Sequence, residues 1–394
     1  MSTAPDIDTS DFYSFEHLLS EDDRTYLHSV RDWMTADVAP IVNSHWEAAT
    51  FPFEVIPGFA ELGLGGVPYK GYGCRGSSFL LDGMIAMELA RTDSSIATFN
   101  GVHGGLAMGS IYLCGSDEQR ERFLPDMARY EKIGAFGLTE PDVGSGVSGG
   151  LTTTAERRGD TWILNGQKKW IGNATFSDLT IIWAKDVADG QVKGFVVENS
   201  SPGFTAEKQS HKIALRIVQN ALITLENVEV PEENRLQNAN SFKDTAEVLR
   251  VTRAGVAWMA IGCARGAYEN ALRYACEREQ FGRPIGSFQL VQDLLVRMLG
   301  NITSSLALCA RLSALQDEGH AEDRHSSLAK AFCTVRMRET VGWARELMGG
   351  NGILLEHNVG RFVADAEAIY SYEGTREVNT LIVGRSLTGR GAFV

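Results

Sequence analysis

The hydrophobic period changes twice along this chain of 394 residues. Up to about residue 134, apolar side chains recur three or four positions apart, as they do on one face of a helix. From about 135 to 240 the chain contains short β-branched runs bounded by Gly, Pro, Asn and Asp, which are typical of strands. The helical period then returns. We therefore predict a mostly α, α+β fold of three domains: a helical domain over 1–134, a small β-barrel or sandwich over 135–240 and a helical bundle over 241–394.

Three local signals refine this prediction. Ser20 opens the stretch SEDDRTYLHSVRDWM, which has the pattern of a capped helix start. Residues 290–312 carry one apolar stripe, and a helix of about 23 residues is roughly 34 Å long, as in a helical bundle. The pair Asn165–Gly166 stands between apolar runs and predicts a hairpin turn.

The composition is that of an ordinary globular protein, with 44% apolar and 22% charged residues. The net charge of −13 argues against nucleic acid or an anionic membrane surface as a partner. None of the six cysteines has a metal-ligand spacing, so we expect no metal site and a reducing compartment. The acidic N-terminus has no apolar signal core, and no apolar run reaches the ~18 residues of a membrane span, so we expect a cytoplasmic protein.

Two stretches of the middle zone combine glycine with polar or aromatic side chains. The sequence FGLTEPDVGSG at 136–146 offers hydroxyls and backbone N–H groups on irregular chain, which suits a flat polar ligand or a phosphate. A domain-boundary turn would have the same composition. In KKWIGN at 168–173, Trp170 is either the wall of an aromatic ligand site or a core residue.

Two further stretches lie in the last zone. In REQFGRPIGSFQ at 278–289, Phe281 and Gly282 interrupt a long helix just after Arg278. An arginine there can bind phosphate through charge-assisted bonds, or it is simply solvated. In ELMGGNGI at 346–353, the clustered glycines allow close approach to a ligand or another subunit, or they end a helix.

The stretch IYSYEGTREVNTLIVGR at 369–385 places Glu373 between two helical segments. Ala366–Tyr370 has the character of a buried helix end, and a second helix is predicted to start near Thr375. Gly374 allows the backbone to bend between them. From these residues alone, Glu373 is either an ordinary capping carboxylate or an acid–base group held on a bend.

Taken in this order, LTEPDVGSG, REQFGRPIGSFQ, MGGNG and YEGT resemble the acyl-CoA dehydrogenase family of flavoproteins, over nearly the whole chain. The resemblance implies the three-domain fold predicted above, with a four-helix bundle as the C-terminal domain. It also implies a homotetramer or homodimer, and one FAD per subunit that a neighbouring subunit helps to bind. The segments WEAATFPF, KGYG and GRSLTG are similar to the glutaryl-CoA dehydrogenase branch and to plant short-chain acyl-CoA oxidases. No Rossmann, P-loop or hydrolase motif competes with this resemblance.

The resemblance implies that Glu373 removes the pro-R α-proton of an acyl-CoA thioester while the β-hydride passes to flavin N5. A weakly acidic C–H needs a base in an apolar, water-poor setting, and Ile369, Tyr370 and Tyr372 supply apolar neighbours. Some relatives carry the base at the position of Thr252 instead. A threonine cannot serve as that base, which favours Glu373.

The resemblance also assigns contacts to residues on the irregular segments quoted above, and none of them binds a metal. FAD binding is assigned to Leu138, Thr139, Trp170, Ile171, Arg278, Phe281, Gln289, Glu346, Gly349, Gly350, Thr375 and Glu377. Substrate binding is assigned to Ser145, Arg253 and Gly374.

Three positions depart from the family pattern. Ala97 stands where glutaryl-CoA dehydrogenases hold the distal carboxylate with an arginine, so we expect a short, uncharged acyl chain. Gly172 stands where most dehydrogenases have a threonine that bonds flavin N5, and the plant oxidases resemble this chain there. Gly146 replaces a usual aspartate, which predicts a looser loop.

Several functions therefore stay open at this point. The main expectation is a dehydrogenase that passes electrons to an electron-transfer flavoprotein. The alternatives are an oxidase that passes electrons to O₂, a glutaryl-CoA dehydrogenase, and a non-catalytic member that keeps only the fold. A substrate carried by acyl-carrier protein rather than CoA is a further variant.

Overall fold

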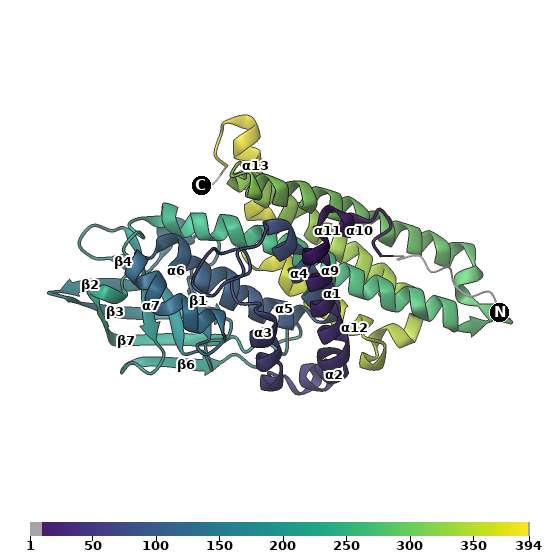
Figure 1. Ribbon diagram of the computed structural model, residues 1–394, viewed down its shortest axis with the longest axis horizontal. Helices are drawn as coiled ribbons and strands as arrows, with labels where there is room; N and C mark the ends of the chain where they lie inside the picture. The colour runs from purple at the N-terminus through teal and green to yellow at the C-terminus, as the bar shows by residue number, and fades with distance from the viewer. Residues whose placement is uncertain (1–9, 393–394) are drawn as a thin grey trace. The chain divides into compact units, whose positions relative to one another are not determined.

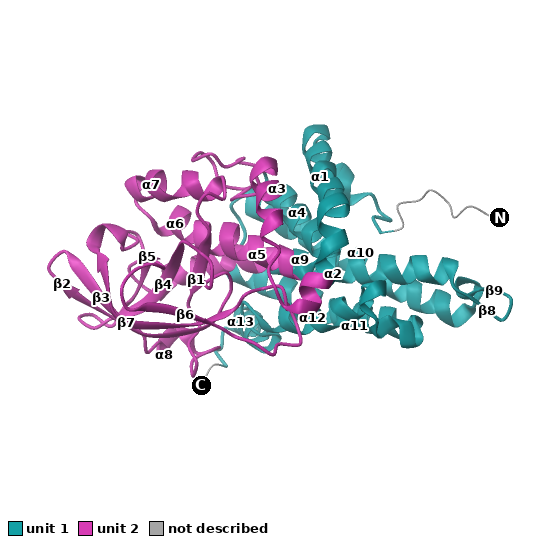
Figure 2. Cartoon of the chain, turned by 90° about the horizontal axis from the view of Figure 1, so that it is seen from below, with its two compact units in different colours: residues 1–43, 78–94, 256–394 teal, residues 44–77, 95–255 magenta. Residues whose placement is uncertain are grey.

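The computed structural model describes residues 10–392, so the first nine residues of the acidic N-terminal segment lie outside the described residues. Figure 1 shows the elements in chain order, coloured from the N-terminus to the C-terminus. The chain forms two compact units (Figure 2). Unit 1 comprises residues 1–43, 78–94 and 256–394, and unit 2 comprises residues 44–77 and 95–255.

Unit 1 is built from helices that the apolar stripes of the sequence require. Ser20 caps α1, since its side chain accepts a hydrogen bond from the backbone N–H of Asp23 (3.1 Å). The long helices pack side by side as the predicted bundle. The helices of this unit, two of which run on into unit 2, are η1 (Phe15–Leu18), α1 (Glu21–Trp33), η2 (Met34–Val38), α2 (Ala39–Ala48), α4 (Phe79–Thr92), α9 (Phe242–Glu277), η6 (Ile285–Ser287), α10 (Gln289–Asp317), α11 (Asp323–Leu347), η7 (Gly349–Ile353), η8 (Leu355–His357), α12 (Val359–Ser371) and α13 (Arg376–Thr388).

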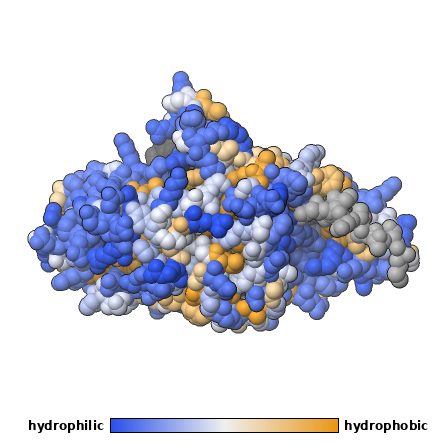
Figure 3. Space-filling model, in the orientation of Figure 1, coloured by the Kyte–Doolittle hydropathy of each residue, from blue (hydrophilic) through white to orange (hydrophobic). Residues whose placement is uncertain are grey.

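Helix α10 is longer than the stripe at 290–312 predicted. Met298 and Ile302 are buried, whereas Val291 and Leu294 nearer its start are half-exposed. By length and composition α10 would also suffice to cross a membrane. The sequence-based exclusion of any such helix was therefore too strong, although α10 packs on α4 and α11 within unit 1. The face drawn in Figure 3 is largely hydrophilic, with scattered hydrophobic residues.

A β-hairpin closes one end of the bundle after α9. Strands β8 (Glu279–Gln280) and β9 (Arg283–Pro284) pair antiparallel, and Phe281 and Gly282 form the turn. Both turn residues have positive φ, 56° and 78°, as a two-residue hairpin with the twist of its strands requires. The predicted helix break at this pair is confirmed.

Unit 2 is a seven-stranded sheet with helices against one face. The order is β1-β4-β2-β3-β7-β6, and β5 pairs with β4. β4 runs parallel to β1 and β2, and the other pairs are antiparallel. The strands are β1 (Gly134–Gly137), β2 (Thr154–Arg158), β3 (Thr161–Ile171), β4 (Leu179–Asp186), β5 (Val192–Glu198), β6 (Phe204–Lys208) and β7 (Ala221–Pro231).

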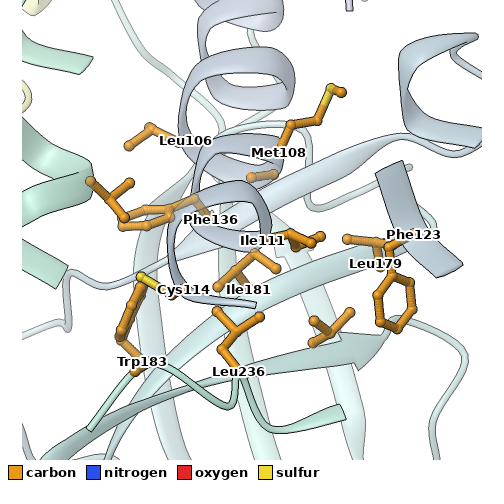
Figure 4. Packing of buried hydrophobic residues seen from close by; sticks show 14 of the residues in the cluster. Leu106, Met108, Ile111, Cys114, Phe123, Phe136, Leu179, Ile181, Trp183 and Leu236 are labelled. Carbon is orange, nitrogen blue, oxygen red and sulfur yellow. The ribbon is translucent and has the colours of Figure 1, made fainter. Parts of the chain in front are cut away.

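Each face of this sheet has its own apolar core. On one face, η4 (Gly101–Met108) and α6 (Gly109–Cys114) pack on the strands; Figure 4 shows Ile111 of α6 near Ile181 of β4. On the other face, Trp162, Phe195 and neighbours form a second cluster where the sheet curls on itself. The remaining helices of the unit are η3 (Phe53–Val55), α3 (Ile56–Leu62), α5 (Ser94–Asn100), α7 (Asp117–Ala128), α8 (Val147–Gly150) and η5 (Glu232–Asn234). The predicted fold class, in which a small β domain stands between a helical domain and a helical bundle, is confirmed.

The predicted hairpin at Asn165–Gly166 is wrong. The pair lies inside β3, at a register irregularity against β7, and Gly166 has a φ of 142°. A Cβ on Gly166 would lie 2.6 Å from Thr153 Oγ1, so the glycine is required by a close approach inside the sheet. The actual turn between β2 and β3 falls at Gly159, whose φ is 65°.

Candidate active site

Glu373 lies in a four-residue connection, residues 372–375, between two helices. α12 ends at Ser371 and α13 begins at Arg376, with Thr375 as the N-cap. Glu373 has a φ of 51° and Gly374 a φ of 89°, so both residues are left-handed. The predicted helix break is confirmed, but the carboxylate residue itself adopts the strained backbone. A non-glycine residue in this region of φ requires support from the surrounding structure.

The turn is held from its C-terminal side by α13. Buried Asn379 donates from Nδ2 to the carbonyls of Gly374 (2.9 Å) and Thr375 (3.0 Å). The Thr375 hydroxyl accepts from the backbone N–H of Val378 (3.3 Å). On the other side of Glu373, the Tyr372 hydroxyl lies 3.4 Å from the sulfur of Met259 in α9. The side chain of Glu373 is half-buried among these groups.

In unit 2, the loop after β1 is anchored by a buried ion pair that the sequence did not reveal. Lys168 Nζ of β3 lies 2.8 Å from Glu140 Oε1 and 3.0 Å from the Leu138 carbonyl. Glu140 also accepts the backbone N–H groups of Thr152 (2.7 Å) and Thr153 (2.9 Å). Both side chains of the pair are at most 1% exposed. These contacts fix the backbone of Leu138 and of the loop residues that follow it.

Burial and pairing shift the pKa values of both partners. Burial lowers the pKa of Lys168 to about 8, although the negative charge of Glu140 acts to raise it. Burial alone would raise the pKa of Glu140, but the Lys168 charge and four hydrogen bonds lower it to about 2. The pair is therefore ionised at neutral pH.

The four residues assigned to the flavin ring come together at the end of β3. The backbone N–H of Lys169 donates to the Thr139 carbonyl (2.8 Å), which sets Trp170 and Ile171 beside the 138–146 loop. Trp170 is 55% exposed and has a φ of 67°, so it is not a core residue. Its backbone N–H donates to Gln209 Oε1 (3.0 Å).

The substrate positions assigned in unit 2 lie in different settings. Ser145 is exposed on the loop, and Arg253 is buried on α9. The hydroxyl of nearby Thr252 is bonded back to its own helix, at the Val248 carbonyl (3.3 Å). A Cβ on Gly172 would lie 3.2 Å from Val102 Cγ2, so an apolar side chain crowds this position.

The remaining FAD positions separate into two groups within unit 1. One group lies at the hairpin end of the bundle, where Asn351 Nδ2 donates to the Tyr274 hydroxyl (2.9 Å) and Arg278 N–H donates to the Tyr274 carbonyl (2.8 Å). Phe281 is 93% exposed there. This group comprises Arg278, Phe281, Gln289, Glu346, Gly349 and Gly350, all of them exposed.

Thr375 and Glu377 form the second group, beside Glu373. Helix α12 runs from the 346–358 segment to Ser371, and its 13 residues span about 20 Å. Figure 2 shows the β8–β9 hairpin at the far end of the bundle from α13. The structure thus does not bring the hairpin group to Glu373 within one chain. Of the clustered glycines, Gly352 packs closely against the backbone of α11, because a Cβ added there would lie 2.6 Å from the Arg345 carbonyl oxygen.

Glu140, Lys168 and Lys330 are buried polar residues beside the candidate site that no motif in the sequence indicates. Lys168 occupies a buried position of β3. Lys330 lies on the buried face of α11, together with Cys333 and Met337. A lysine on an apolar face is a usable signal, because such a side chain is almost never buried without a partner.

The comparisons with known proteins identify the family. Family models match in order: acyl-CoA dehydrogenase, N-terminal domain (residues 20–131), middle domain (135–228) and C-terminal domain (242–388). A crystal structure of glutaryl-CoA dehydrogenase from Mycobacterium smegmatis is 39% identical, with a TM-score of 0.94, covering 98% of this chain and 99% of that one.

Two further comparisons concern cofactor and partner. A glutaryl-CoA dehydrogenase from Mycobacterium smegmatis in complex with FADH₂ is 35% identical, with a TM-score of 0.95, covering 98% of this chain and 100% of that one. The caffeyl-CoA reductase–Etf complex subunit CarC of Acetobacterium woodii is 32% identical, over 93% of this chain and 98% of that protein. The chain therefore belongs to the acyl-CoA dehydrogenase family of FAD-dependent enzymes.

Proposed function

We propose that this enzyme converts a short, uncharged acyl-CoA thioester to the 2-enoyl-CoA, with Glu373 as the base that takes the α-proton. The observation that carries the proposal is the left-handed turn at Glu373 (φ 51°), where a half-buried carboxylate stands between two helix ends. A strained backbone at a carboxylate is typical of a functional site. The neighbouring helix start at Thr375 adds N–H groups that favour negative charge.

The residues at the end of β3 fit the isoalloxazine ring of FAD. Trp170 exposes its indole, and the backbone of Leu138, Thr139 and Ile171 lies beside it on anchored chain. An exposed aromatic face and fixed backbone groups suit a flat heteroaromatic ring. When bound, FAD supplies the acceptor for the β-hydride.

The hairpin group of unit 1 supports a shared site between subunits. Arg278, Phe281 and Gln289 are exposed at the end of the bundle and are separated from Glu373 by the length of α12. A guanidinium and an exposed aromatic ring suit a diphosphate and an adenine. We therefore propose that this group binds the FAD of a neighbouring copy, in a homotetramer or homodimer.

The preference for an uncharged chain rests on Ala97 and its surroundings. Ala97 is buried on α5, at the position where the glutaryl-CoA branch carries arginine. Burial lowers the pKa of His103 to about 4, so this imidazole is neutral and offers no cation. It donates from Nε2 to the Met127 carbonyl (2.9 Å) and accepts the Gly134 N–H at Nδ1 (3.0 Å). Lys70 and Arg75 are both exposed.

The acceptor of the electrons has two candidates. The likeness to a subunit of an Etf complex supports an electron-transfer flavoprotein. Gly172, crowded by Val102 and Val218, supports O₂, because no hydroxyl stands where dehydrogenases bond flavin N5. We favour the flavoprotein.

One experiment tests the function as a whole. The purified holoenzyme is assayed with acyl-CoAs graded in length, charge and branching, in air and under anaerobic conditions, with and without an artificial acceptor. Acceptor-dependent formation of 2-enoyl-CoA is expected. Turnover in air alone, with peroxide formed, would identify an oxidase. A flavin-bearing protein inactive on every thioester would contradict the proposal.

A further inference from the structure

Lys330 is fully buried on α11, on the side that faces the turn of Glu373. Its side chain is 0% exposed. Nζ donates to the Tyr370 carbonyl (3.0 Å) and to the Gly374 carbonyl. A buried amino group requires acceptors in place of water, and these two backbone carbonyls accept hydrogen bonds from Nζ.

The two acceptors lie on either side of Glu373. Tyr370 belongs to the last turn of α12, where carbonyls have no partner within the helix. Gly374 precedes Thr375, the N-cap of α13. One ammonium thus joins the end of one helix to the start of the next, and both helices pack on α11. Only three residues separate the two bonded carbonyls along the chain, and Glu373 is among them.

The turn requires this support because its backbone is unfavourable. Glu373, with a φ of 51°, carries a Cβ that the left-handed region disfavours. A turn of this kind relaxes to another backbone geometry unless contacts on both sides fix it. Asn379 fixes the Gly374 and Thr375 carbonyls from α13. Lys330 also donates to the Gly374 carbonyl, and through its second bond, to the Tyr370 carbonyl, it links this carbonyl to the end of α12.

We propose that Lys330 is a positioning residue for Glu373, which holds the strained turn so that the carboxylate points in a single direction toward the α-carbon. The proposal rests on the proposed function, in which Glu373 is the base. Lys330 touches neither substrate nor cofactor in this role; it acts through the two carbonyls. Removing it leaves the base chemically intact but lets the turn relax, which lowers the fraction of enzyme that is correctly aligned.

The test compares Lys330→Met with Thr334→Val in the FAD-loaded enzyme. Thr334 lies one turn farther along α11, is equally buried, and bonds only the helix backbone, at the Lys330 carbonyl (2.8 Å). In Lys330→Met we expect kcat to fall by about tenfold or more, with KM changed less than about threefold. Exchange of the substrate α-proton with solvent deuterium should fall in parallel. Thr334→Val should keep kcat and exchange within about twofold.

A conservative variant separates positioning from mere stability. Lys330→Arg keeps a cation with several donors and should recover part of kcat and of the exchange rate, at similar FAD content and thermal midpoint. Unchanged kcat and exchange in folded Lys330→Met would overturn the proposal. So would failure of both Lys330 variants to fold while Thr334→Val folds, since that would assign Lys330 a purely structural role.

Glu373→Gln, measured alongside, separates a failure of the proposed function from a failure of the positioning role of Lys330. If Glu373→Gln keeps full turnover, the base is misassigned and the proposed function fails. If Glu373→Gln loses turnover and exchange while Lys330→Met keeps both, the base stands and the positioning role is wrong.

Discussion

Lys168 and Glu140 form an ion pair inside unit 2, with Nζ and Oε1 2.8 Å apart and neither side chain more than 1% exposed. The pair joins β3 to the loop after β1, and the same ammonium bonds the Leu138 carbonyl. The backbone that flanks the proposed flavin position therefore depends on a buried charge. Removing one partner of such a pair is far more costly than removing both, because it leaves an uncompensated charge in the interior.

Glu140→Gln should destabilise the protein by about 3–5 kcal/mol, since it leaves the Lys168 ammonium without its counter-charge. The double variant Glu140→Leu/Lys168→Met should be less destabilised than Glu140→Gln alone. Urea unfolding of the two variants measures this. The single variants Glu140→Leu and Lys168→Met complete the cycle. If their losses of stability add up to that of the double variant, the two charges do not interact.

The same pair predicts a pH dependence of stability. The folded pKa of Glu140, about 2, lies below its ordinary value of 4.5. As the pH falls, the unfolded chain therefore binds the proton before the folded one does. The contribution of Glu140 to the free energy of unfolding is present above about pH 4.5 and is lost as the pH falls toward 2. It amounts to about 3 kcal/mol, at 1.36 kcal/mol per pKa unit.

Urea midpoints measured between about pH 5.5 and pH 3.5 should fall more steeply for the wild type than for Glu140→Leu/Lys168→Met. The double variant is the matched control, because all other carboxylates titrate in both proteins. Equal slopes would mean that Glu140 does not have the lowered pKa.

Glu373→Gln should retain FAD and lower turnover by about 10²-fold or more, the usual contribution of a positioned general base. Glutamine keeps the shape of the side chain but cannot take the α-proton. Glu367→Gln is the control, because this exposed carboxylate of α12 pairs with Arg338 at 2.9 Å and lies within the helix before the turn. Flavin absorbance and kcat are measured for both. Near wild-type turnover in Glu373→Gln would remove the residue from the role.

Butyryl-CoA should exceed glutaryl-CoA in kcat/KM by more than about a hundredfold, because an unpaired carboxylate in an apolar pocket costs at least ~3 kcal/mol. Ala97→Arg should narrow this ratio by restoring a cation, and Ala97→Leu, which adds bulk without charge, is its control. Steady-state kinetics with both thioesters decide the matter. Equal use of glutaryl-CoA by the wild type would mean that another cation reaches the distal carboxylate.

Local signals were sufficient for much of the fold. The hydrophobic period predicted helices, a small sheet and helices again, Ser20 marked a helix start, and Gly374 marked the break beside Glu373. Each of these signals acts over a few residues, so the sequence alone carries it. Asn165–Gly166 was misread for the same reason: its turn preference is local, whereas the contact with Thr153 that decides its role is not.

The sequence by itself determined the family motifs, the identity of the carboxylate in YEGT and the absence of an arginine at Ala97. Only the tertiary structure decided what supports these residues. Lys168 is separated from Glu140 by 28 residues, and Lys330 from Tyr370 by 40, so no local pattern pairs them. Burial made those pairings necessary, because a charge inside a protein requires acceptors that only the folded chain brings within reach.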